Sequence, residues 1–276
     1  MTSSNRPSPM STTEPWELVA EGYAAEASLV MGPLSRRAGE SLAPASNARV
    51  LDVAAGPGTL ALQLAPHVRE LVAVDFSERM IGELSRAAAR AKLENVRAIV
   101  ADGQALPFGD DEFDAAFSLF GLMFFADRAR GYSELHRVLK PGAGVLVSSW
   151  ASFEESSLMR ALFGALAAVD PSFTSPKKDS ASLENPDVLA AELRAAGFER
   201  VSVEPVTQRV RPHNAADLWQ RMVRSSAPLL MLRHRLGESE WQRREPGVHA
   251  YLSEALAREP ELSTTALFGI GYKPAR

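Results

Sequence analysis

The chain has 276 residues, of which 46% are hydrophobic, and a formal net charge of −4. This length can bury one full α/β core with added segments, and the mildly acidic charge argues against general nucleic-acid binding. Cysteine is absent, which excludes disulfides and thiolate metal sites, and the five histidines show no metal-binding spacing, so we expect no metal.

The N-terminal region contains a polar tail and then a helix. Residues 1–13 are rich in Ser, Thr, Pro and Asn and lack an apolar signal core, so we expect a disordered tail on a cytoplasmic protein. No apolar run of 18 residues exists, so we expect no membrane span and no membrane partner. From Pro15 to Met31, apolar residues recur at steps of three and four, which predicts an amphipathic helix.

A glycine-containing turn follows the first predicted strand. Val50, Leu51 and Val53 form a short apolar run typical of a buried strand, and a helical pattern resumes at Leu60. Between them the sequence Ala54-Ala55-Gly56-Pro57-Gly58 leaves backbone N–H groups free above the sheet and lets a ligand approach closely. This arrangement indicates a nucleotide-type cofactor site. Taken alone, the turn also fits the loose dinucleotide pattern.

Two further strands end in acids. Residues 71–75 are a buried strand ending at Asp75, about 20 residues after the glycines, which suits a carboxylate that accepts hydrogen bonds from ribose hydroxyls. Residues 96–101 form a third strand that leads into Asp102-Gly103-Gln104. Asp52 lies inside the first strand, where a dinucleotide site needs no acid. These features favour another nucleotide cofactor over NAD.

Five segments in this order resemble the class I S-adenosylmethionine (SAM) dependent methyltransferases, in the group of the ubiquinone/menaquinone-type and many small-molecule enzymes. The segments are 50–58, 74–80, 101–108, 113–118 and 139–144. The resemblance covers roughly residues 46–150. Ala54 departs from the family pattern, which often has glycine there. Alanine adds only a methyl group, so we expect cofactor binding to survive.

The resemblance implies roles for individual residues. Backbone groups of 54–56 would lie along the methionine part of SAM, Asp75 would accept both ribose hydroxyls, Met80 would pack on the adenine, and Asp102 would accept the adenine amino group. The full expected cofactor set is Asp52, Ala54, Ala55, Gly56, Gly58, Asp75, Phe76, Met80, Asp102, Gly103, Gln104 and Ser118. Structural alternatives are a helix N-terminal acid for Asp75, a core residue for Met80 and a turn former for Asp102.

The remaining elements complete an α/β pattern. We expect strands over 113–118, 144–150, 201–206 and 264–272, the last antiparallel beside the fifth, and helices after Asp127, after residue 152 and from Asn185 to Gly197. The predicted fold is a Rossmann-like, mostly parallel seven-stranded sheet with an antiparallel last strand. We expect one domain over 14–276, with helical lid segments 14–45, 152–184 and 209–262.

Aromatic residues predict an acceptor pocket. Phe120 and Phe124 follow the fourth strand, at the edge where an α/β sheet binds ligands, and Trp16 lies on the N-terminal helix. The alternative is that these rings only complete the core. Residues 209–245 carry eight arginines against four acids. This stretch could attract an anionic acceptor or simply form a solvated helix face.

The sequence therefore predicts methyl transfer from SAM to O, N or C of a small, partly apolar metabolite. Positioning could suffice for this reaction; Tyr23, His213 and His234 are candidate bases if the acceptor must lose a proton. No Asn/Asp-Pro-Pro-aromatic tetrad is present, which counts against nucleic-acid substrates. The alternatives are a SAM-fold protein that binds without catalysis and an NAD(P)-dependent reductase. The sequence leaves a homo-oligomer open.

Overall fold

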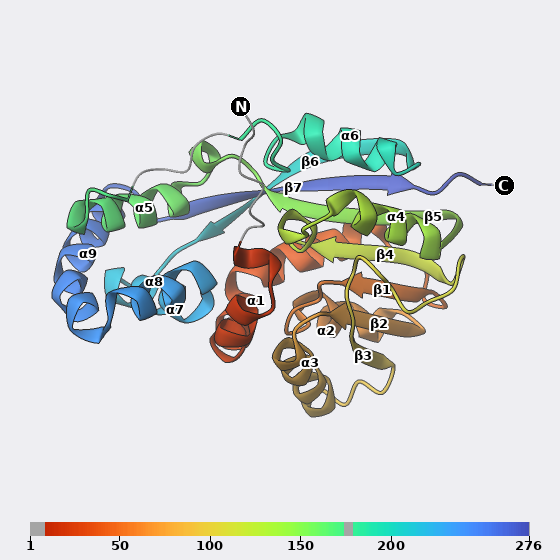
Figure 1. Cartoon of the computed structure of the whole chain (residues 1–276), viewed down its shortest axis with the longest axis horizontal. Helices are drawn as coiled ribbons and strands as arrows, with labels where there is room; N and C mark the ends of the chain where they lie inside the picture. Colours follow the sequence, from red (N-terminus) through yellow and green to blue (C-terminus); the bar gives the residue numbers. More distant parts are fainter. Residues whose placement is uncertain (1–8, 174–178, 276) are drawn as a thin grey trace.

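A seven-stranded sheet with the order β3-β2-β1-β4-β5-β7-β6 forms the centre of the protein in this computed structural model, which describes residues 9–173 and 179–275 (Figure 1). The strands are β1 (Arg49–Val53), β2 (Glu70–Asp75), β3 (Val96–Val100), β4 (Phe113–Leu119), β5 (Leu139–Trp150), β6 (Glu199–Val210) and β7 (Leu262–Tyr272). All neighbouring pairs are parallel except those that involve β7. The predicted mostly parallel sheet with an antiparallel last strand is confirmed.

Helices cover both faces of this sheet. They are α1 (Glu14–Leu42), α2 (Thr59–Leu64), α3 (Glu78–Arg90), α4 (Arg128–Val138), α5 (Ser157–Val169), α6 (Pro186–Ala195), α7 (Ala215–Ser225), α8 (Ala227–Leu236) and α9 (Glu238–Arg258), with 3₁₀ turns at Pro9–Ser11, Ala65–His67, Leu122–Phe124 and Phe153–Glu155. One core contains Leu135 of α4 and Leu193 of α6. The core on the opposite face contains Leu34 of α1, Leu64 of α2 and Leu84 of α3. The result is a three-layer α/β structure.

Capping residues set several helix boundaries where the sequence predicted them. The Ser77 hydroxyl accepts a hydrogen bond from the Met80 N–H at the start of α3, and Asn185 caps α6 in the same way. Helix α6 ends before Gly197, whose φ of +96° is a conformation that glycine adopts without strain. These boundaries follow from residues within one turn of the helix end.

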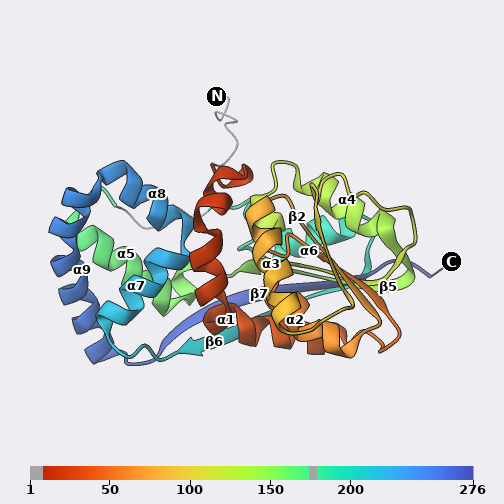
Figure 2. The same cartoon turned by 90° about the horizontal axis from the view of Figure 1, so that it is seen from below.

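A second group of helices packs beside the sheet. Helices α5, α7, α8 and α9 share their own apolar core, which includes Leu162, Trp219, Leu232, Trp241 and Leu252. Figure 2 shows this group at one end of the molecule, with α1 standing between it and α3. The predicted lid segments 152–184 and 209–262 thus contribute to one helical unit. Residues 174–178 of the predicted lid segment 152–184 lie outside the described residues.

The structure corrects two predicted boundaries in the N-terminal region. Helix α1 continues past Met31 to Leu42 and includes Pro33. Of the predicted disordered tail, residues 1–8 lie outside the described residues, but residues Pro9–Ser11 form a 3₁₀ turn. This turn is tied to α1, because Trp16 Nε1 donates a hydrogen bond to the Met10 carbonyl oxygen at 2.9 Å.

Strands β5 and β6 are longer than their apolar runs predicted. β5 begins at Leu139 directly after α4, with a register shift against β4 between Phe113 and Ala115. β6 continues to Val210, where it pairs with Leu262. The exposed face of β6 carries polar residues, so the apolar pattern did not predict the last four residues of this strand. The extension carries the β6–β7 pair out to the helical unit.

Candidate functional site

A cavity of about 480 Å³ opens above the carboxyl ends of the parallel strands. Its wall includes Ala54 after β1, Asp75 at the end of β2, Asp102 after β3, Phe120 after β4 and Trp150 at the end of β5. Helices α1, α5, α7 and α8 close the cavity from the other side. This is the edge at which open α/β sheets bind ligands.

The turn after β1 has the conformation expected of a ligand-binding loop. Ala54 and Gly56 are both left-handed, with φ of 56° and 54°. A Cβ placed on Gly56 would meet only Tyr23, at 4.0 Å, so the space above this backbone is open and a side chain would fill it. At Gly58 a Cβ would instead lie 2.6 Å from Leu84, so this glycine is required for packing against α3. Ala54 tolerates a left-handed conformation that costs alanine about 1 kcal/mol.

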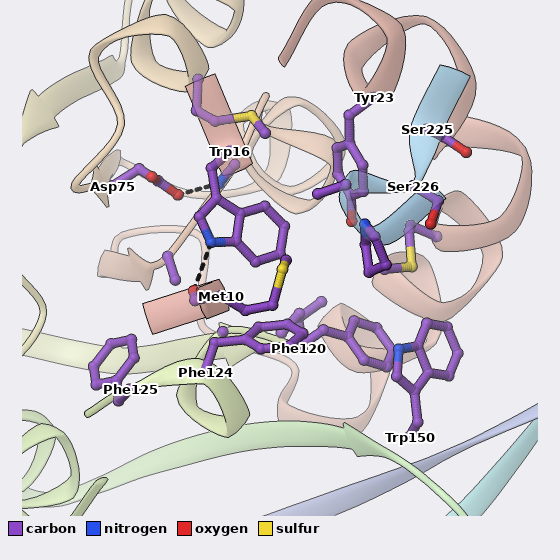
Figure 3. Close-up of a pocket in the computed structure, with 18 of the residues that line it drawn as sticks. Met10, Trp16, Tyr23, Asp75, Phe120, Phe124, Phe125, Trp150, Ser225 and Ser226 are labelled. Atoms are coloured by element: carbon purple, nitrogen blue, oxygen red, sulfur yellow. Dashed lines mark hydrogen bonds between the residues drawn. The ribbon is translucent and has the colours of Figure 1, made fainter. Parts of the chain in front are cut away.

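Asp75 is held beside this turn by two backbone donors. The Gly56 N–H donates to Oδ2 at 2.8 Å (Figure 3). The Ser77 N–H donates to Oδ1 at 2.9 Å. Burial raises the pKa of Asp75 to about 6, although the N–H groups of Ser77 and Gly56 oppose this shift. Each oxygen keeps a free lone pair, because an ionised carboxylate can accept about four hydrogen bonds. Asp75 is therefore fixed in place and can still accept from a ligand.

Asp52 lies behind the cavity rather than in its wall. Its side chain is 1% exposed within β1, and Oδ2 has no hydrogen-bond partner among the described residues. Burial, and repulsion from Asp75, raise the pKa of Asp52 to about 8. Near neutral pH this carboxyl is mostly protonated, so it adds little negative charge to the site.

The loop after β3 forms a compact edge of the cavity. Asp102 Oδ1 accepts from the Gln104 N–H at 2.8 Å, and Gln104 Oε1 in turn accepts from the Asp127 N–H at 2.8 Å. A Cβ on Gly103 would lie 2.6 Å from Phe125, so only glycine allows the loop to lie against this ring. The predicted turn-forming role of Asp102 is real, and the residue also lines the cavity.

Aromatic rings line much of the rest of the cavity. Phe120 stacks on Trp150 with ring centroids 4.2 Å apart, and Trp16 packs edge-on against Phe124 at 5.1 Å. Phe120 has a φ of 58°, and its N–H donates to the backbone and hydroxyl oxygens of Ser148. In the view of Figure 3, Asp75 lies toward one end of the cavity and Trp150 toward the other. The cavity thus has a polar part and an apolar, aromatic part.

Tyr23 is the titratable hydroxyl in the wall. Burial, and to a smaller extent the charge of Asp75, raise the pKa of Tyr23 to about 12. The phenol stays protonated at neutral pH and can donate a hydrogen bond. Among the described residues, the charged side chains in the wall are acids: Glu26, Asp75 and Asp102. The described wall contains no Lys, Arg or His.

The structure brings most of the predicted site residues together. Those in the cavity wall are Trp16, Tyr23, Ala54, Gly56, Asp75, Phe76, Met80, Asp102, Gly103, Gln104, Phe120 and Phe124. Met80 is also 2% exposed, so the core alternative for this residue holds as well. The structure places Asp52, Ala55, Gly58 and Ser118 behind the wall. The Ala55 N–H is used by the Val74 carbonyl oxygen, and Ser118 is fully buried.

The predicted bases His213 and His234 are not in the site. His213 is exposed on the loop before α7, and His234 is exposed on α8. The arginine-rich stretch is also largely engaged: Arg209, Arg221, Arg224, Arg233, Arg243 and Arg244 form ion pairs with nearby acids. The arginines of this stretch are therefore mostly paired with acids, and the expectation that they attract an anionic acceptor is not supported.

Several wall residues were missed in the sequence. Met10 and Ser11 belong to the segment predicted to be disordered, and Glu26, Met222 and Ser225 lie on helices whose facing could not be predicted. Trp150 could have been found, because it ends β5 at the same edge as the recognised residues. The others depend on how α1 and the helical unit pack against the sheet.

The fold and the cavity define a nucleotide-binding α/β protein of the Rossmann-like type, and comparison with known proteins identifies its family. A family profile described as "Methyltransferase domain" matches residues 50–142. A demethylmenaquinone methyltransferase from Clavibacter sepedonicus is 34% identical over 178 residues, which cover 60% of this chain and 72% of that protein. A Deinococcus radiodurans protein of the same name is 36% identical over 58% of this chain and 71% of its own.

A solved structure described as the [4+2]-cyclase SpnF shares the fold, with a TM-score of 0.62 and 19% identity over 98% of this chain and 97% of its own. The chain belongs to the class I SAM-dependent methyltransferases, in the ubiquinone/menaquinone-type group. Its cofactor is SAM, and membership of this family argues against both the reductase and the non-catalytic alternative. Among residues 9–173 and 179–275, no helix has the length and apolar content needed to cross a bilayer.

Proposed function

We propose that this enzyme methylates O, N or C of a small, partly apolar acceptor without negative charge that binds in the aromatic part of the cavity. The observation that carries the proposal is the division of one cavity into a polar part around Asp75 and an aromatic part around Phe120 and Trp150. SAM supplies a methyl group that its sulfonium has already activated. The protein then has to hold donor and acceptor in line and keep water out.

The polar part suits the donor. Asp75 is positioned to accept from ribose hydroxyls, since two backbone donors fix it and each oxygen keeps a lone pair. The open backbone at Ala54 and Gly56 would face the methionine part, while Phe76, Met80, Asp102, Gly103 and Gln104 would surround the adenine. Gly103 packs closely on Phe125, so the backbone of this loop lies in the cavity wall, where it can border the adenine.

The aromatic part suits an acceptor without negative charge. Trp16, Phe120, Phe124 and Trp150 offer flat apolar surfaces on which a planar group can stack. A carboxylate or phosphate would enter without a Lys, Arg or His in the described wall to balance its charge, and burial of an unpaired charge is costly. The curated relatives are named for demethylmenaquinone, and an acceptor with a neutral ring agrees with this wall.

Among the described wall residues outside the donor part, the one carboxylate, Glu26, is paired with two arginines, and there is no His or Lys to act as a base. Tyr23 keeps its proton at neutral pH because its pKa is about 12, so its role would be to donate a hydrogen bond to the acceptor. An acceptor that ionises by itself in water, or that has a free lone pair, can react under these conditions. Catalysis would then rest on positioning and exclusion of water, which can supply a large part of a rate enhancement.

The test combines donor binding with a screen for products. Calorimetry should show that the wild type binds SAM and that Asp75→Ala weakens binding by about 1–3 kcal/mol, the cost of losing a charged hydrogen-bond acceptor. Incubation with SAM and metabolite extracts, followed by mass spectrometry, should then reveal a product heavier by one methylene unit. Unchanged SAM affinity in Asp75→Ala would refute the donor assignment, and methylation restricted to anionic acceptors would refute the acceptor class.

A further inference from the structure

Glu26 on α1 holds two arginines of α7. Arg224 Nε and Nη2 donate to Glu26 Oε1 at 3.1 and 2.7 Å, and Arg221 Nη1 donates to Oε2 at 3.3 Å. The Glu26 side chain is 13% exposed, and it also lines the cavity. Arg221 is itself oriented by Asp217, which accepts from its Nε at 2.8 Å. A single carboxylate thus joins elements about 195 residues apart in the sequence.

The backbones of the two helices touch next to this carboxylate. A Cβ on Gly22 would lie 2.2 Å from the Arg224 carbonyl oxygen, so α1 and α7 pack with no space for a side chain at this position. Gly22 and Glu26 are one helical turn apart on the same face of α1. The contact and the ion pairs therefore form one seam between α1 and α7.

The seam is part of the wall beside the aromatic rings. Tyr23 lies on the α1 side of it, and Met222 and Ser225 lie on the α7 side (Figure 3 labels Tyr23 and Ser225). The helical unit that carries α7 has its own apolar core, separate from the two cores of the sheet. The contact between α1 and α7 consequently fixes where Tyr23, Met222 and Ser225 lie in this wall.

We propose that Glu26 is a positioning residue that fixes the α7 wall of the acceptor compartment and so determines how tightly the acceptor binds. This inference rests on the proposed function, since it assumes that the aromatic part holds the acceptor. Loss of the carboxylate leaves two arginine forks without their common partner, and the seam loosens. Asp75, Asp102 and the turn after β1 make none of the seam's contacts, so the donor should keep its affinity.

The test measures the two compartments separately. Donor binding is followed by calorimetry with S-adenosylhomocysteine, which resembles SAM but has no methyl group to transfer. Acceptor-side binding is followed in that complex with N-phenyl-1-naphthylamine, a neutral aromatic probe that fluoresces in apolar surroundings. In Glu26→Gln we expect the dissociation constant of the probe to rise about three- to tenfold, as for partly exposed charged hydrogen bonds. The affinity for S-adenosylhomocysteine should stay within about twofold.

Two further variants act on the same seam. Arg224→Gln should reproduce the effect of Glu26→Gln, and the double variant should be no worse than either single one, because both remove the same interaction. Gly22→Ala should weaken binding of the probe without changing any charge, because the added methyl group must push the two helices apart. Glu238→Gln removes a comparable arginine pair that is exposed and outside the cavity wall, so it is the matched control and should change nothing.

The outcomes separate this inference from the proposed function. Failure of the wild type to bind S-adenosylhomocysteine would contradict the function itself. Probe binding that survives Phe120→Ala would show that the probe is not in the aromatic part and would overturn the compartment assignment together with the inference. Normal probe binding in Glu26→Gln and Gly22→Ala, with wild-type donor affinity, would overturn the inference alone.

Discussion

The carboxylate of Asp75 receives hydrogen bonds from two different segments, the glycine turn after β1 and the start of α3. These bonds favour its ionised form, whereas burial favours its protonated form, and burial is the larger effect. The balance leaves the carboxyl with a pKa of about 6, close to neutral pH. A group poised in this way links donor binding to pH.

We predict that SAM affinity falls as the pH drops below about 6. Ribose hydroxyls donate to the ionised carboxylate, so a protonated Asp75 must lose its proton before it binds, and the affinity should fall up to about tenfold per pH unit. Calorimetry from pH 5 to pH 8 with S-adenosylhomocysteine measures this dependence. Asp75→Asn should bind weakly with a flat profile over this range. A wild-type affinity that is flat down to pH 5 would contradict the assignment.

Tyr23 provides a second prediction at the level of one residue. Because its pKa is about 12, the phenol cannot act as a base near neutral pH, and Tyr23→Phe should remove a hydrogen bond but no proton acceptor. We expect the turnover number to fall by no more than about tenfold, compared with 10²–10⁴-fold for loss of a general base. The pH profile of turnover with an acceptor found in the product screen should keep its shape. A loss above a hundredfold, together with disappearance of the rise in turnover with pH that a base of high pKa produces, would restore Tyr23 as the base.

At the level of elements, one carboxylate connects α7 and α9. The indole N–H groups of Trp219 and Trp241 both donate to Glu245 Oε1, at 3.2 and 3.1 Å, and the two rings stack at 5.3 Å. Both tryptophans are nearly fully buried. The helical unit is therefore held by a polar contact inside its apolar core, and removal of the acceptor leaves two buried donors unpaired.

We predict that Glu245→Ala lowers the free energy of unfolding by about 1–3 kcal/mol, the cost of leaving buried donors unsatisfied. Urea unfolding followed by tryptophan fluorescence measures the loss, and these two indoles report directly on the affected region. Glu254→Ala, also on α9, is the control: its pair with Arg258 is 71% exposed on the glutamate side and should contribute less than about 1 kcal/mol. Equal losses in the two variants would show that the indole contact does not stabilise the helical unit.

At the level of the whole molecule, the sheet was more predictable than the site. Apolar runs such as 50–53 and 71–75 indicate buried strands by themselves, and the caps Ser77 and Asn185 set helix boundaries locally. The placement of the last strand, antiparallel beside the fifth, followed from the resemblance. The extension of β6 and the seam between Gly22 and Arg224 depend on contacts between distant segments, which no local pattern contains.

The same distinction applies to the cavity. The polar part was predictable, because Asp75 ends β2, Asp102 closely follows β3, and the ends of parallel strands meet at one edge. The sequence did not show which faces of α1 and α7 turn toward the cavity. Glu26 was therefore missed, and the placement of His213 in the site was wrong. A histidine near a helix start has the same sequence signal whether the helix turns it toward a cavity or toward water.

Two buried acids in one sheet make the stability of the whole protein depend on pH. The pKa of Asp52 is about 8 in the folded protein and 3.8 in an ordinary exposed setting. Between these values the folded state keeps a proton that the unfolded state releases, so the free energy of unfolding falls as the pH rises from about 4 to 8. Asp52→Asn has no proton to release and should lose this part of the slope.

We therefore expect Asp52→Asn to gain stability relative to the wild type as the pH rises, by on the order of 3–4 kcal/mol between pH 5 and pH 8. Urea unfolding at several pH values measures the two slopes, so a constant cost of the new amide does not affect the comparison. Asp114→Asn is the control. Burial opposes the shift, but hydrogen bonds from the Arg49 N–H and Lys140 hold the pKa of Asp114 below its ordinary value. Asp114→Asn should therefore change the pH dependence of stability only at lower pH. Parallel slopes for Asp52→Asn and the wild type would show that Asp52 is already ionised in the folded protein, and that the sheet carries a full buried charge beside Asp75.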